Sequence, residues 1–198
     1  MRALVIVAAM VAAVAAVAPA SAGPADTPGF TKAFSCSACH GAAGASRADA
    51  VPVLAGMPAW YFKKAIDDYA TGRRLSPEME PFSKMIRTLG VDDVAGYFAA
   101  QPRAASPIKA DSAAVGRGRT ASAACASCHG GNGRGDQTKG APDLTGQPPG
   151  YLLNQMKLFK AEKRSPGDAN LTAVKAVMKG IDDATLADLA AYYSSLGR

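Results

Sequence analysis

The sequence contains few cysteine, histidine and aromatic residues, and beyond residue 20 it has no apolar run long enough to span a bilayer. Its 198 residues include 4 Cys, 2 His and 1 Trp, and aromatic residues make up 7%. The missing apolar runs exclude a multi-pass membrane protein. Because charged residues amount to 19% and hydrophobic residues to 48%, a wholly disordered chain is excluded as well.

The N-terminus is typical of a targeting segment. A short positive start, Met1-Arg2, precedes an apolar run from Ala3 to Val17 and a small-residue segment that ends at Ala22. We therefore predict a signal peptide over residues 1–22 and a periplasmic mature protein. An uncleaved anchor helix is the alternative, although the run is short for spanning. Nucleic acid is not expected as a partner in that compartment.

The rest of the chain contains two copies of one pattern at nearly constant spacing. The matching pairs are Cys36-Ser37-Ala38-Cys39-His40-Gly41 with Cys125-Ala126-Ser127-Cys128-His129-Gly130, Pro52-Val53-Leu54-Ala55-Gly56 with Pro142-Asp143-Leu144-Thr145-Gly146, Tyr61 with Tyr151, and Arg74 with Arg164. Such a duplication predicts two similar domains, over residues 23–100 and 113–198. Residues 101–112 are rich in Pro, Ala and Ser and are predicted to be a linker.

The periodicity of the apolar residues predicts an all-α protein. Helical spacing is found over residues 60–71, 150–162 and 184–196, with Asp183 as the expected N-cap of the last helix. Short helices are expected around 28–38 and 113–127. The Gly- and Pro-rich stretches 41–58 and 130–150 are predicted loops, and they are long unless another group fills the interior.

All four cysteines and both histidines lie in two Cys-x-x-Cys-His motifs, which in an exported protein indicate covalent attachment of c-type haem. Two thioethers hold the porphyrin, and the adjacent histidine binds the iron as the proximal ligand. A domain of about 80 residues buries little core of its own, so a bound macrocycle also supplies the missing apolar interior.

Three other interpretations of these motifs are weaker. Two disulfides would leave both histidines without a role. A zinc site needs four ligands, whereas each cluster offers three. A thioredoxin-like redox pair requires a strand–helix context that the pattern lacks.

With these motifs, the sequence resembles the dihaem class I cytochromes c of the cytochrome c4 family over residues 28–198. The resemblance implies an all-α fold of two tandem class I cytochrome c domains, each wrapped around a covalently attached haem. It further implies two haem c groups, held by the cysteine pairs Cys36 with Cys39 and Cys125 with Cys128. The proximal ligands would be His40 and His129.

The resemblance also implies a methionine as the sixth ligand of the first iron. In the family, this methionine lies seven residues before the apolar residue that opens the last helical segment. Met79 fits this spacing relative to Ile86, and Met85 is the competing candidate. A thioether favours ferrous iron and raises the reduction potential. Met57, beside the Leu-Ala-Gly turn, is interpreted as loop packing.

The second copy departs from the pattern, because Val174 stands where the ligand is expected. Met178, three residues before Ile181, is the candidate, and Lys175, Lys179 or an open site are the alternatives. Met156 is interpreted as core on the preceding helix. Since the chain has no third histidine, bis-histidine ligation of either iron is excluded.

The resemblance implies an electron carrier between a respiratory donor and a terminal oxidase or reductase, not an enzyme. The alternatives are a dihaem redox enzyme of the thiosulfate dehydrogenase kind with a substrate-accessible second haem, or a permanently bound electron-accepting subunit. The net charge of +6 suits acidic redox partners or peripheral association with an anionic membrane. Arg73, Arg74 and Arg164 lie where the family often places a base near a haem propionate.

Overall fold

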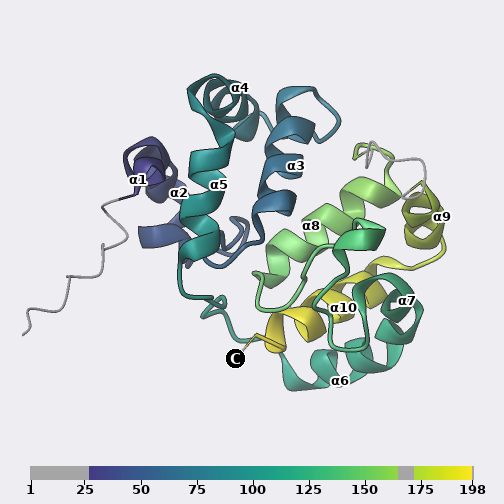
Figure 1. Cartoon of the computed structure of the whole chain (residues 1–198). Helices are drawn as coiled ribbons and strands as arrows, with labels where there is room; N and C mark the ends of the chain where they lie inside the picture. The colour runs from purple at the N-terminus through teal and green to yellow at the C-terminus, as the bar shows by residue number, and fades with distance from the viewer. Residues whose placement is uncertain (1–26, 165–171, 198) are drawn as a thin grey trace, which may run out of the picture.

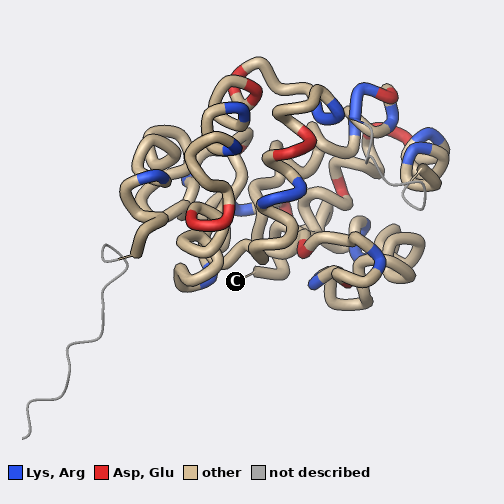
Figure 2. The backbone as a smooth tube through the Cα atoms, turned by 45° about the horizontal axis from the view of Figure 1, so that its top comes forward, with Lys and Arg blue, Asp and Glu red and all other residues tan. Residues whose placement is uncertain are grey.

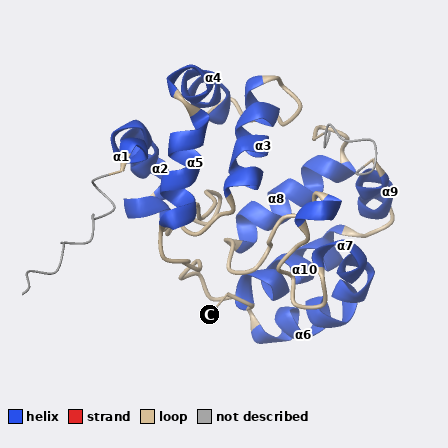
Figure 3. Cartoon of the chain, in the orientation of Figure 1, coloured by secondary structure: helices blue, strands red, loops and turns tan. Residues whose placement is uncertain are grey.

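The computed structural model describes residues 27–164 and 172–197, so the predicted signal peptide, residues 1–22, lies outside the described residues. Helices and loops make up this part of the chain, with two isolated β-bridges, Arg74 with Arg164 and Asp136 with Ala141 (Figure 3). The predicted all-α class is confirmed. Among the described helices, none has both the length and the apolar character needed to cross a bilayer.

The helices form two successive groups that lie beside each other in Figure 1. The first group consists of α1 (Pro28–Ala33), α2 (Ser37–His40), α3 (Ala59–Ala70), α4 (Met79–Leu89) and α5 (Val91–Ala100). The second consists of α6 (Ser112–Ala121), α7 (Ala126–His129), α8 (Pro149–Lys160), α9 (Ala173–Lys179) and α10 (Asp183–Ser195). Helices α3, α8 and α10 agree with the three predicted from periodicity. Helices α4 and α9 occupy the segments where the resemblance implies ligand loops.

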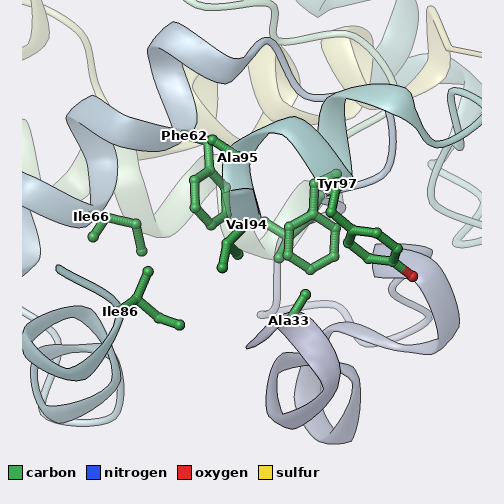
Figure 4. Packing of buried hydrophobic residues seen from close by; sticks show 9 residues of the cluster. Ala33, Phe62, Ile66, Ile86, Val94, Ala95 and Tyr97 are labelled. Carbon is green, nitrogen blue, oxygen red and sulfur yellow. The ribbon is translucent and has the colours of Figure 1, made fainter. Parts of the chain in front are cut away.

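Each group has its own apolar core. In the first, Phe62 and Ile66 from one face of α3 meet Ile86 of α4 and Val94 and Phe98 of α5 (Figure 4). These residues recur at helical spacing, which brings them onto the inner face of each helix. The second core is built from the facing residues of α8 and α10, namely Tyr151, Leu152, Leu186, Leu189, Ala190, Tyr192 and Tyr193.

The N-cap of α10 is Asp182, so the prediction of Asp183 was wrong by one residue. Asp182 has extended backbone angles, and its carboxylate accepts the Thr185 N–H at 2.8 Å. Asp183 is already helical, and its carboxylate instead pairs with Lys160 and Lys157. A capping side chain must precede the first helical residue to reach the free N–H groups, which Asp183 does not.

The first and last helices of each half cross so closely that a glycine is required at the crossing. A Cβ atom at Gly118 of α6 would lie 2.0 Å from the Asp188 carbonyl oxygen of α10. At Gly29 of α1 the corresponding distance to the Asp93 carbonyl oxygen of α5 is 2.1 Å. These contacts are with backbone atoms, which cannot rotate away. The repeated glycine therefore fixes the same helix crossing in both halves.

We expect Gly118→Ala to lower the free energy of unfolding by about 3 kcal/mol, because the new methyl group overpacks a backbone contact. Gly116→Ala, two residues away in the same helix, is the matched control. A Cβ atom there meets nothing within 4 Å, and alanine raises helix stability by up to about 1 kcal/mol over glycine. Thermal and denaturant unfolding of the two variants measure the difference. Equal stabilities would contradict the crossing described above.

The two halves and the segment between them are held together by polar contacts. The Gln147 side chain accepts the Val53 N–H at 3.0 Å and donates to the Val53 carbonyl at 2.9 Å. Asp49 accepts the Gly150 N–H at 2.8 Å with its carboxylate, at the start of α8. Arg103, in the predicted linker, pairs with the Asp143 carboxylate at 2.7 Å. Since these contacts join separate segments at several points, the structure fixes how the two halves lie relative to each other.

Candidate haem-binding sites

The first Cys-x-x-Cys-His motif lies at the wall of a cavity of about 570 Å³. Cys36, Cys39 and His40 line it together with apolar side chains from α3 and α4. Residues of α8, including Tyr151 and Leu158, complete the wall from the other half. A mostly apolar cavity with two thiols and an imidazole at its edge has the chemistry that a covalently attached haem requires.

Both histidines are held with one ring nitrogen occupied and the other left available. The Nδ1 atom of His40 lies 2.9 Å from the Pro52 carbonyl oxygen, and that of His129 lies 2.8 Å from the Pro142 carbonyl oxygen. Each carbonyl oxygen accepts a hydrogen bond from the Nδ1–H group, so Nε2 carries the lone pair that can bind a metal. Burial lowers the pKa of both imidazoles, which favours the neutral form that a metal ligand needs.

No disulfide bond joins any of the four cysteines, which counts against the disulfide interpretation. Within the ranges 27–164 and 172–197, no three or more His, Cys, Asp or Glu side chains converge as a metal site would require. The zinc interpretation therefore loses its support too.

Burial raises the pKa of the Cys36 and Cys125 thiols. The first cysteine of each motif is half-buried and the second is exposed, so the two copies have the same asymmetry.

The structure separates the two methionine candidates for the first iron. Met79, the first residue of α4, is half-buried, packs against the first core and lines the cavity together with His40. Met85, on the same helix, is 38% exposed and does not line the cavity. Met57, predicted as loop packing, packs against that core and also borders the cavity. Met79 is thus the better placed of the two candidates.

In the second half, Met178 of α9 is half-buried and packs against the second core. Met156 of α8 packs against the same cluster, as the sequence predicted for a core residue. Lys179, one of the alternatives, is engaged with the Glu162 carboxylate at 2.5 Å. Met178 therefore shares with Met79 its partial burial against the core of its own half, even though the spacing in sequence differs.

The three arginines selected from the sequence fall into two kinds. Arg73 is largely solvated and pairs with Asp67 and Asp68, so it is the charged end of a helix. Arg74 is 2% exposed and Arg164 is 9% exposed. Buried guanidinium groups need a partner, and a carboxylate-bearing ligand would supply one. Arg74 borders the first cavity, so it is placed to hold a haem propionate.

Each buried arginine donates to a tyrosine of the opposite half. The Arg74 Nη2 atom lies 2.6 Å from the Tyr151 hydroxyl, and the Arg164 Nη2 atom lies 3.2 Å from the Tyr61 hydroxyl. Burial alone would raise the pKa of Tyr61, but the charges of Arg164 and Arg74 outweigh it and lower that pKa to about 8. The pairs that matched in the repeat thus meet crosswise at the interface.

Sequence reasoning missed two features of these sites. The carbonyls of Pro52 and Pro142 orient the histidines, and the repeated Pro-x-Leu-x-Gly pattern was a signal that could have indicated them. Gln155, which accepts from both buried arginines, had no such signal. The equivalent position in the first copy is Ala65, so the repeat does not mark this residue.

Comparisons with known proteins agree with this architecture. The family model for cytochrome c matches residues 115–197. Cytochrome c4 of Pseudomonas aeruginosa is 30% identical over 175 residues, covering 85% of this chain and 87% of the relative. The thiosulfate dehydrogenase electron acceptor of Stutzerimonas stutzeri is 29% identical, covering 84% of this chain and 81% of the relative. The crystal structure of reduced cytochrome c4 from Pseudomonas stutzeri superposes with a TM-score of 0.73 at 28% identity, covering 84% and 96% of the two chains.

The helical fold and the two Cys-x-x-Cys-His motifs define a dihaem c-type cytochrome with two class I domains, a protein class that transfers electrons. This chain belongs to the cytochrome c4 family.

Proposed function

We propose that this protein is a periplasmic electron carrier whose haems are attached through Cys36 and Cys39 and through Cys125 and Cys128. His40 and His129 are the proximal ligands, and Met79 and Met178 complete the coordination of the two irons. Each bound haem supplies one-electron Fe(II)/Fe(III) chemistry, while the chain sets the potential through its ligands and the burial of the site. The domains run over 23–100 and 113–198, with the linker at 101–112 and a cleaved signal peptide at 1–22.

The observation that carries this proposal is that His40 and Met79 line one and the same cavity in the first half. There the Pro52 carbonyl orients the imidazole of His40, and Met79 lines the same apolar space. With His40 and Met79 both bound to the iron of an attached haem, no position would be left open to small molecules, which suits a carrier. An enzyme of this class would need an exchangeable position at one iron instead.

Redox proteins are the partners of such a carrier, and we infer that the donor is a periplasmic dehydrogenase. One relative is named a thiosulfate dehydrogenase electron acceptor. A thiosulfate dehydrogenase structure from Marichromatium purpuratum also superposes, with a TM-score of 0.71 at 28% identity, on 80% of this chain. This chain covers only 36% of that structure. The similarity therefore supports an electron-accepting role more than a complete dehydrogenase.

Positive and negative residues of the first half pair with each other, and this affects how strongly its surface attracts a charged partner. Basic and acidic positions are interspersed along the backbone of this half (Figure 2). Lys32 pairs with Asp93, and Lys63 lies 2.8 Å from the Asp92 carboxylate. Since exposed pairs of this kind largely cancel each other's charge, we propose that the net positive charge of the chain acts mainly as a weak, long-range attraction toward acidic partners.

The experiment that tests this proposal separates a carrier from an enzyme. With thiosulfate and ferricyanide present, the purified dihaem protein alone is expected to show no thiosulfate turnover above the protein-free background. In a second reaction without ferricyanide, a catalytic amount of a thiosulfate dehydrogenase is added to the oxidised protein and excess thiosulfate. The two electrons released as two thiosulfates form tetrathionate are then expected to reduce both haems, as measured by visible absorption. Turnover by the protein alone would replace the carrier proposal with catalysis, and failure of the dehydrogenase to reduce either haem would refute this donor.

A further inference from the structure

Two buried arginines from different halves share a single hydrogen-bond acceptor. The Gln155 Oε1 atom accepts from Arg74 Nε at 3.0 Å and from Arg164 Nη1 at 2.8 Å. The backbones of the two arginines also meet in the isolated bridge between residues 74 and 164. In the described part of the chain, neither guanidinium makes an ion pair with a carboxylate. The acceptor that both guanidiniums share is therefore a neutral amide, beside the tyrosine hydroxyl to which each of them also donates.

A neutral acceptor has a specific consequence at this position. Two like charges repel strongly in a buried, low-dielectric setting, so without a common acceptor the side chains would turn apart. A carboxylate would hold them as well, but it would also neutralise the positive charge. The amide oxygen of Gln155 holds both guanidiniums and leaves their charge available for the carboxylates of a bound haem.

The pair of arginines reaches from one half to the other. Arg74 borders the first cavity and stacks on the Tyr69 ring, with 4.5 Å between its guanidinium carbon and the ring centroid. Arg164 stacks in the same way on the Phe159 ring of the second half, also at 4.5 Å. Because Gln155 joins them, a displacement of one guanidinium is transmitted to the other.

We propose that Gln155 is a positioning residue that holds Arg74 and Arg164 as one unit at the interface of the two halves and thereby sets the rate of electron exchange between the two haems when both are attached. This inference rests on the proposed function, since it requires both haems to be attached. Only the second copy of the repeat can hold the two arginines in this way, because Ala65 occupies the position equivalent to Gln155 in the first copy.

The test compares two glutamine variants of the same interface. Gln155→Leu keeps the approximate volume and removes the shared acceptor. Gln147→Leu is the matched control, because the Gln147 side chain hydrogen-bonds to the Val53 backbone across the interface rather than to Arg74 or Arg164. In half-reduced protein, exchange spectroscopy of the haem methyl resonances gives the interhaem rate. Gln155→Leu is expected to slow it several-fold with two haems and unchanged methionine–iron absorption, while Gln147→Leu retains the rate of the unmodified protein.

Two results would overturn the proposal: an unchanged rate in Gln155→Leu, or an equal slowing in Gln147→Leu, which would assign the effect to general loosening of the interface. If Gln155→Leu does not accumulate with two haems, Gln155→Glu decides. Its carboxylate is expected to lower the reduction potentials of both haems, and a shift confined to either one of them would refute the shared role. Haem content of the unmodified protein is measured alongside, so absence of two haems would count against the proposed function rather than against Gln155.

Discussion

Replacement of both Cys125 and Cys128 by alanine is expected to yield a protein that carries one haem instead of two. Without the thioethers, the second haem cannot be retained covalently, whereas the first motif is untouched. Native domains are stable by only about 5–15 kcal/mol. Loss of the group that fills the interior is therefore expected to abolish the cooperative unfolding of the second half. Haem content per polypeptide and differential scanning calorimetry measure the two effects.

The control is Ser127→Ala, which alters the residue between the two cysteines and leaves both thiols in place. Ser127 is exposed, so its replacement is expected to preserve two haems and both unfolding transitions. If the double variant still carried two covalent haems, the second haem would not be attached through Cys125 and Cys128. Loss of both haems in the double variant would show that the halves are not independent in binding.

Replacement of Met79 by alanine is expected to lower the reduction potential of the first haem. The thioether sulfur favours the ferrous state, so its removal destabilises reduced iron relative to oxidised iron. Axial ligands span about 0.8 V in haem proteins, and we expect a drop of roughly a tenth to a third of that range. Spectroelectrochemistry gives the potential, and the weak ferric methionine–iron absorption band reports the ligand directly.

Met85→Ala is the matched control, because it removes a thioether from the solvent-facing side of the same helix. Met85 is 38% exposed and makes no part of the cavity wall, so its replacement is expected to leave the potential and the absorption band unchanged. The ligand assignment would be wrong if Met85→Ala abolished the band while Met79→Ala retained it.

Much of the architecture could be predicted because the chain repeats itself. Two spaced copies of Cys-x-x-Cys-His predicted two haem sites, and apolar residues at helical spacing predicted helices that correspond to α3, α8 and α10. The equivalence of Arg74 with Arg164 was visible as well. A repeat shows which residues correspond to each other, but it does not show that they come into contact.

The remaining features depend on tertiary contacts, which local patterns do not contain. Gln155 has its role only because Arg74 of the other half reaches it. The N-cap of α10 was misplaced because two aspartates stand in succession, and only the backbone angles distinguish Asp182 from Asp183. Met178 lies outside the family spacing, yet α9 brings it against the second core. In each case the residue type was visible, and its surroundings were not.

The intact mass of the mature protein, measured under denaturing conditions, tests the central claim most directly. Two covalent haems predict the mass of the polypeptide from residue 23 plus two haem groups, because thioether bonds survive unfolding whereas coordination bonds do not. A mass equal to that of the bare polypeptide, or of the polypeptide with a single haem, would contradict the account.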